Sequence, residues 1–189
     1  MTTQTTLDVH RDDGPLASVL HKVRLPFPEV IVLGSAALLS ATGAVVVLVG
    51  TAPPVPRWWL AAGVWALALT GVAGRALPRL DWPMPALLRG TEYAVVLMLV
   101  GDDPWTYALL ATLAFHHYDI VYRVALRGAG PPVWLRRVSG GWSLRLPLLI
   151  VATAVGVEQH AAAALTLVLA PMLLAESVFC WTRASRDRR

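Results

Sequence analysis

Six apolar segments separated by short charged loops restrict this chain to a bundle of helices. The segments cover residues 30–49, 58–73, 84–100, 105–122, 144–157 and 161–181. Each is close to, or somewhat below, the ~20 residues that cross the hydrocarbon core of a membrane as a helix. A backbone in lipid has to form its hydrogen bonds within its own segment, so helices are the expected structure. We therefore predict an all-α, polytopic membrane protein with six transmembrane helices.

The composition and the positions of the charges agree with this prediction. Hydrophobic residues make up 56% of the 189 residues and charged residues only 15%, whereas about a quarter of the residues in a soluble domain are charged. With a cytoplasmic N-terminus, the outer loops contain Arg57 beside Asp102, Asp103 and Glu158, and the other loop arginines are inside. This distribution predicts a multi-pass protein of the cytoplasmic (inner) membrane with both termini in the cytoplasm. It also accounts for the net charge of +4 without a nucleic-acid partner.

This topology predicts three regions. Residues 1–28 form a polar cytoplasmic leader, in which residues 16–23 are expected to form an interfacial helix on the membrane surface. Residues 29–182 form the six-helix transmembrane domain, and residues 183–189 form a basic cytoplasmic tail. Cys180 is the only cysteine, which excludes an intramolecular disulfide and a cysteine-based metal motif.

Ionisable residues inside the predicted spans gather in the inner half of the bundle. They are Arg89 and Glu92 of the third segment, His116, Asp119 and Arg123 of the fourth, Arg145 of the fifth and Glu176 of the sixth. The three residues of the fourth segment are spaced by three and four, so they share one helix face. Charged groups at membrane depth are costly and usually functional, so this layer predicts a polar pocket that opens to the cytoplasm.

The residue types predict an anionic, phosphorylated ligand. Candidate ligands of a Mg²⁺ ion are the carboxylates Asp119, Glu92 and Glu176. Candidate substrate-binding residues are Arg89, Arg123, Arg145, Arg136, Arg137 and Tyr122. Candidate catalytic residues are Asp119, Glu92 and His116, since phosphoryl transfer needs positioned charge and a base for a hydroxyl proton.

Each of these residues also has a structural alternative. Asp119 and Arg123 are four residues apart and can form an ion pair within one helix, as can Arg89 and Glu92 at three apart. Glu176 has no partner nearby in sequence, so it has to be neutral or paired with another helix. Small residues at every fourth position in the first two segments allow either close packing within the bundle or a homodimer.

Four stretches of the chain resemble a known family. They are Asp-Asp-Gly-Pro-Leu-Ala (12–17), Leu-Arg-Gly-Thr-Glu-Tyr (88–93), His-Tyr-Asp-Ile-Val-Tyr-Arg (117–123) and Gly-Gly-Trp (140–142). In this order they resemble an uncharacterised actinobacterial integral-membrane domain, which often stands C-terminal to nucleotidyltransferase and CDP-alcohol phosphatidyltransferase modules. The resemblance implies a role in phospholipid or polyol-phosphate metabolism and a partner of the CDP-alcohol phosphatidyltransferase type.

The chain is not itself similar to those transferases at their metal site. Their signature is Asp-x2-Asp-Gly-x2-Ala-Arg followed by Gly-x3-Asp-x3-Asp, and it is matched here only by Asp13-Gly14-Pro15-Leu16-Ala17, with Ser18 in place of the arginine. The expected function is therefore to bind or process a phosphate-bearing lipid or CDP-alcohol-type intermediate. If the protein is an enzyme, it is a membrane-embedded transferase. The alternatives are a non-catalytic membrane anchor or scaffold for a soluble partner enzyme, and a small transporter.

Overall fold

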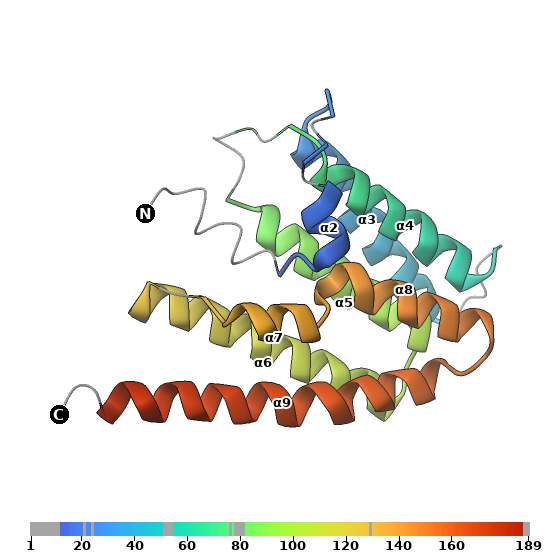
Figure 1. Ribbon diagram of the computed structural model, residues 1–189. Helices are drawn as coiled ribbons and strands as arrows, with labels where there is room; N and C mark the ends of the chain where they lie inside the picture. Colours follow the sequence, from blue (N-terminus) through green and yellow to red (C-terminus); the bar gives the residue numbers. More distant parts are fainter. Residues whose placement is uncertain are drawn as a thin grey trace.

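The described part of the chain is built from helices (Figure 1). The computed structural model describes residues 12–20, 22–23, 25–50, 55–75, 77, 82–128 and 130–186. Within these residues the only strand-like pairing is an isolated bridge between Pro28 and Arg75. The all-α prediction is therefore confirmed.

Helices occupy all six predicted segments. They are α3 (Glu29–Leu48), α4 (Arg57–Val72), α5 (Met84–Val100), α6 (Pro104–Arg127), α8 (Gly141–Ala154) and α9 (Glu158–Arg186). Among the described residues, two short helices lie outside them, α2 (Pro15–Leu20) and α7 (Val133–Val138). The polar stretch after Phe115 does not interrupt α6, which continues to a left-handed cap at Gly128. At its start, the Asp103 side chain accepts a hydrogen bond from the backbone N–H of Trp105 at 2.8 Å.

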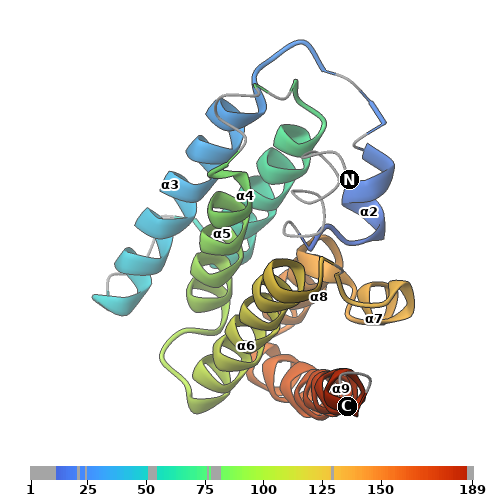
Figure 2. The same cartoon turned by 90° about the vertical axis from the view of Figure 1, so that its left-hand side faces the viewer.

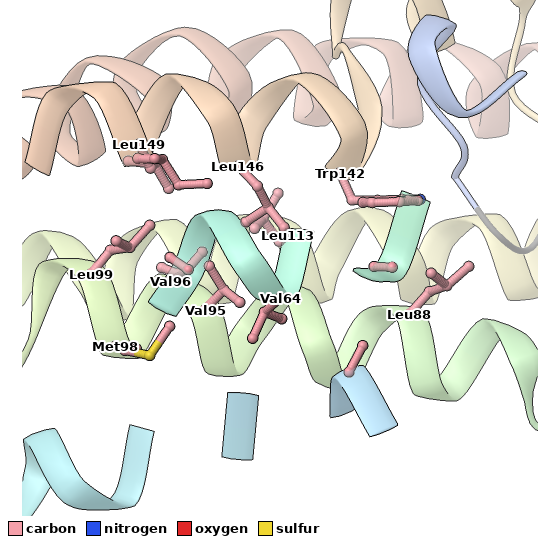
Figure 3. Packing of buried hydrophobic residues seen from close by; sticks show 14 of the residues in the cluster. Val64, Leu88, Val95, Val96, Met98, Leu99, Leu113, Trp142, Leu146 and Leu149 are labelled. Carbon is pink, nitrogen blue, oxygen red and sulfur yellow. The ribbon is translucent and has the colours of Figure 1, made fainter. Parts of the chain in front are cut away.

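The helices form two groups that share α8 (Figure 2). In one group α3 packs against α4 and α5, and in the other α6 packs along α9. Helix α8 contacts α4, α5 and α9 and joins the two groups. Figure 3 shows Leu146 and Leu149 of α8 facing Val96 and Leu99 of α5, and all four side chains are buried or nearly so. The core therefore runs between α5 and α8, the two helices that also supply Glu92 and Arg145.

Two described helices, α3 and α9, are long and apolar enough to cross a membrane. Both expose large apolar side chains, including Leu38, which is 70% exposed, and Phe179, which is 64% exposed. Helices α4, α5 and α8 have 16, 17 and 14 residues, which is below the ~20 residues of a full span. Length and composition therefore identify two candidate membrane spans among the described helices. They do not show the other four spans of the predicted six-span topology.

The segment Asp12–Leu20 packs against the end of the bundle. Its helix α2 contacts α4 and α8, and Ala17 is completely buried. The backbone of Gly14 crosses the start of α8 so closely that a Cβ at Gly14 would overlap the carbonyl oxygen of Gly140. A Cβ at Gly141 would likewise overlap the backbone at Gly14. This segment was predicted to be part of a polar leader, and the structure joins it to the bundle; residues 1–11 of that leader lie outside the described residues.

We expect Gly14→Ala to weaken the packing of this segment on α8. The added methyl group has no room, and overpacking of this kind costs about 1–3 kcal/mol of unfolding free energy. Gly34→Ala is the matched control, because a Cβ at Gly34 meets nothing within 4 Å. Thermal unfolding in detergent and amide exchange of residues 16–20 measure the effect. Equal melting temperatures and equal exchange in the two variants would contradict this packing.

Candidate functional site

Most of the ionisable residues singled out in the sequence fall into two buried clusters. The first, called here the Arg145 cluster, consists of Asp12, Glu92, His116, His117 and Arg145. The second, called the Arg123 cluster, consists of Asp119, Arg123 and Glu176. Each cluster places two carboxylates on one guanidinium. The single polar layer predicted from the sequence is therefore divided into two sites.

Arg145 uses all three of its guanidinium nitrogens. Its Nε donates to Oε1 of Glu92 at 2.8 Å and its Nη2 donates to Oδ2 of Asp12 at 2.7 Å. Its Nη1 donates to the carbonyl oxygen of Ser139 at 3.2 Å. The side chains of Arg145, Glu92 and Asp12 are at most 4% exposed. A buried guanidinium is tolerated only with such partners, because an unpaired charge in an apolar interior is very unfavourable.

Two adjacent histidines of α6 face the same carboxylates. The Nε2 atom of His116 lies 3.6 Å from Oδ1 of Asp12, and that of His117 lies 3.5 Å from Oδ2. The Nε2 atom of His117 also lies 3.8 Å from Oε2 of Glu92. Both Nε2 atoms are buried without a hydrogen-bond partner in the described structure. The Nδ1 atom of His117 is 2.7 Å from the hydroxyl of Tyr93; if the hydroxyl donates, the Nε2–H of the ring points to the carboxylates.

Asp12 enters this cluster as an ionised carboxylate. Burial by itself raises the pKa of its carboxyl, but the charge of Arg145 and the contacts with His116 and His117 outweigh burial. Together they hold the pKa of Asp12 well below its usual range. The residue adopts a left-handed backbone conformation with φ of 49°, which aspartate tolerates better than most residues. This conformation belongs to the turn that leads from Asp12 into α2.

Arg123 is the centre of the second cluster. Its Nε donates to Oδ2 of Asp119 at 2.6 Å, and its two terminal nitrogens bind both oxygens of Glu176 on α9. The other oxygen of Asp119 accepts hydrogen bonds from Ser177 and Trp181, each at 3.0 Å. The pair predicted within α6 is therefore present, and Glu176 has the partner on another helix that its position requires. With three donors on its two oxygens, two of them from α9, Asp119 holds α6 against α9.

The Arg123 cluster borders a cavity of about 380 Å³ between α6 and α9. The other lining residues are Arg127, Gly130, Pro132, Phe179, Cys180 and Arg183. One terminal nitrogen of Arg127 donates to the carbonyl oxygen of Cys180 at 3.1 Å, and its guanidinium lies over the ring of Trp181. Arg183 is exposed. The cavity thus combines three guanidinium groups with the Glu176 carboxylate and apolar side chains.

The remaining candidates lie outside the two clusters or at their edge. Arg89 is partly buried on α5, and its charge acts on Tyr93, Asp12 and Glu92. Arg136 and Arg137 belong to α7 and line a smaller cavity of about 210 Å³ beside Gly14. The turn at Gly140 and Gly141 packs against residues 12–14.

Tyr122 and the proposed metal ligands are not brought into one site. Tyr122 lies on another face of α6, where its ring packs against that of Tyr118 and both are exposed. Among the described residues, no group of three or more histidine, cysteine, aspartate or glutamate side chains is arranged to hold a metal ion. Glu92 binds Arg145, whereas Asp119 and Glu176 share Arg123. The three carboxylates named as Mg²⁺ ligands are therefore divided between the clusters.

Two residues of the Arg145 cluster, Asp12 and His117, are not among the candidates that the sequence predicts. Asp12 lies before the first apolar segment, and His117 is not one of the residues of the fourth segment that share a helix face at spacings of three and four. The sequence feature that points to Asp12 is its place in the stretch 12–17, which carries part of the family resemblance. Trp142 carries another part, and its indole N–H donates to Oδ1 of Asp13 at 3.0 Å.

We expect Glu176→Gln to destabilise the protein, since it leaves Arg123 with one charged partner. Breaking a buried ion pair by removing one member costs about 3–5 kcal/mol of unfolding free energy. Glu158→Gln is the matched control, because Glu158 contacts the one-third-exposed Arg57 at 3.6 Å and such pairs contribute about 0–1 kcal/mol. Unfolding in detergent, followed by circular dichroism, measures both. A Glu176 variant as stable as the Glu158 variant would argue against an interior cluster.

Comparison with known proteins places the chain in a family whose function is not known. No curated protein and no solved structure gives a significant match. One family profile matches residues 2–188, which include all four stretches that carried the resemblance. With this match over nearly its whole length, the chain belongs to DUF5941, a family of unknown function.

Proposed function

We propose that this chain is a polytopic protein of the cytoplasmic membrane that binds a phosphate-bearing lipid or CDP-alcohol-type intermediate from the cytoplasmic side. The proposed binding place is the cavity between α6 and α9. The observation that carries the proposal is the lining of this cavity, in which Arg127 and Arg183 stand beside Phe179 and Pro132, while Arg123 is held there by Asp119 and Glu176. Guanidinium groups bind phosphate oxygens, and the apolar side chains suit the glycerol or acyl part of an amphiphile.

The distribution of apolar and charged side chains supports a membrane location. Large apolar side chains are exposed on α3, α8 and α9, for example Leu38, Val151 and Val168, each at least 61% exposed. The guanidinium groups of Arg123 and Arg145 are at most 4% exposed. Extensive exposed apolar surface is unusual for a soluble monomer. In a bilayer the same surface faces lipid, and charged residues face the interior of the bundle.

A second candidate function is a non-catalytic anchor for a soluble partner enzyme. The observation that favours it is α7, a short helix that exposes Val133, Trp134 and Val138 together with Arg137. Exposed aromatic and arginine side chains are typical of protein interfaces. In this proposal the two buried clusters serve to hold the bundle together.

We expect the purified protein to retain a phosphate-bearing lipid or a CDP-linked molecule through the α6/α9 cavity. Native mass spectrometry of wild type should show the bound species, and the double variant Arg127→Gln/Arg183→Gln should lose it. Arg57→Gln is the matched control, because Arg57 is paired with Glu158 at the other end of the bundle. Repeating the measurement with and without Mg²⁺ tests for a metal requirement. Wild type that retains nothing would favour the anchor function.

The topology is tested with single cysteines in a Cys180→Ser background. Gln159→Cys, at the start of α9, should react with a membrane-impermeant maleimide in intact cells. Arg137→Cys, on α7, should react only after the membrane is permeabilised. Both side chains are exposed in the structure, so a difference in labelling reports the side of the membrane. Labelling of both positions in intact cells, or of neither, would contradict the proposed topology.

A further inference from the structure

The Asp12 carboxylate is surrounded by donor groups of the Arg145 cluster, as a bound anion would be. The groups that surround it belong to the bundle: Nη2 of Arg145 on α8, and Nε2 of His116 and His117 on α6. Asp12 itself precedes α2 and reaches these helices from outside the bundle. Arg145 and His116 are separated from it in sequence by more than a hundred residues. The carboxylate of Asp12 thus lies against nitrogen atoms of three side chains on two core helices, α6 and α8.

This set of donors is only partly satisfied by a carboxylate. Arg145 makes a hydrogen bond of 2.7 Å with Asp12, but the two imidazole contacts are 3.5 and 3.6 Å long. Both Nε2 atoms remain without a hydrogen-bond partner although their rings are at least 96% buried. A carboxylate offers two oxygens in one plane to these three donors. A phosphate group offers three tetrahedral oxygens, one for each donor.

The segment that carries Asp12 leads into a short helix at the surface of the bundle. Besides Asp12, Asp13 bonds to the bundle by accepting a hydrogen bond from the indole N–H of Trp142 at 3.0 Å. Helix α2 has six residues, and Leu16 and Val19 on it are exposed. A helix this short has little stability of its own and depends on its contacts with α4 and α8. Short segments of this kind open locally at a much lower free energy than the core unfolds.

We propose that the Arg145 cluster is a binding site for the phosphate group of a ligand, and that Asp12 is an internal ligand that competes for this site. Opening of the segment Asp12–Leu20 releases Nη2 of Arg145 and the Nε2 atoms of both histidines. Glu92 remains on Nε of Arg145 and keeps the guanidinium oriented. Arg89 adds positive charge on the α5 side. This site is separate from the α6/α9 cavity and does not depend on it.

The competition is tested by comparing the affinity for inorganic phosphate of wild type and Asp12→Ala. An internal ligand lowers the apparent affinity by the fraction of molecules in which the site is open. If the segment is closed in about nine-tenths of the molecules or more, Asp12→Ala should bind phosphate at least about tenfold more tightly. Isothermal titration calorimetry in detergent gives both dissociation constants. Asp102→Ala, which removes a carboxylate from the outer loop, is the matched control and should bind as wild type does.

Two further sets of substitutions, each added to Asp12→Ala, show which of the two sites binds the phosphate. The gain in affinity should persist when Arg127→Gln and Arg183→Gln are added, and should vanish when Glu92→Gln and Arg145→Gln are added. The last two changes are made together so that neither leaves an unpaired buried charge. If Asp12→Ala does not fold, Asp12→Asn replaces it, because the amide keeps the shape and removes the charge. Equal phosphate affinity in wild type and the Asp12 variant, or a gain that survives loss of Arg145, would overturn the proposal.

Discussion

The structure depends on one buried guanidinium, that of Arg145. An arginine in an apolar interior has to be matched by acceptors, because leaving its charge unpaired would cost more than the packing around it contributes. Glu92, Asp12 and the carbonyl oxygen of Ser139 supply those acceptors from three different parts of the chain. Their geometry fixes how α5 meets α8 and where the segment before α2 lies. The close approach of Gly14 and Gly141 then follows, since only glycine allows the two backbones to come near enough.

The Arg123 cluster repeats the same arrangement with a different consequence. Again one arginine binds two carboxylates, and again one of them comes from a distant helix. Here, however, the acceptors Asp119 and Glu176 belong to long helices, α6 and α9, that pack along each other. Ser177 and Trp181 complete the bonding of Asp119. This cluster therefore joins two long helices, whereas the Arg145 cluster joins the bundle to the short segment that carries Asp12.

The sequence predicts the helices and the contacts between residues that are near each other in the chain. It does not predict the contacts between residues that are far apart in the chain. Apolar segments of 14 to 21 residues predict helices, and α5 begins and ends where expected. The pair Asp119–Arg123 follows from spacing within one helix, and the partner of Glu176 follows from the cost of an unpaired charge. The contact between Asp12 and Arg145 spans 133 residues, and no periodicity or charge rule relates positions so far apart. For the same reason, spacing indicates only that Glu92 can pair with Arg89, whereas the structure pairs Glu92 with Arg145, 53 residues away.

The four stretches that carry the family resemblance lie close together in the structure. Residues 12–17 contribute Asp12 and Gly14, residues 88–93 contribute Glu92 and Tyr93, and residues 117–123 begin with His117. Residues 140–142 form the turn against which Gly14 packs and lead into the helix of Arg145. All four stretches thus meet at the Arg145 cluster, whereas only the third contributes to the Arg123 cluster and its cavity.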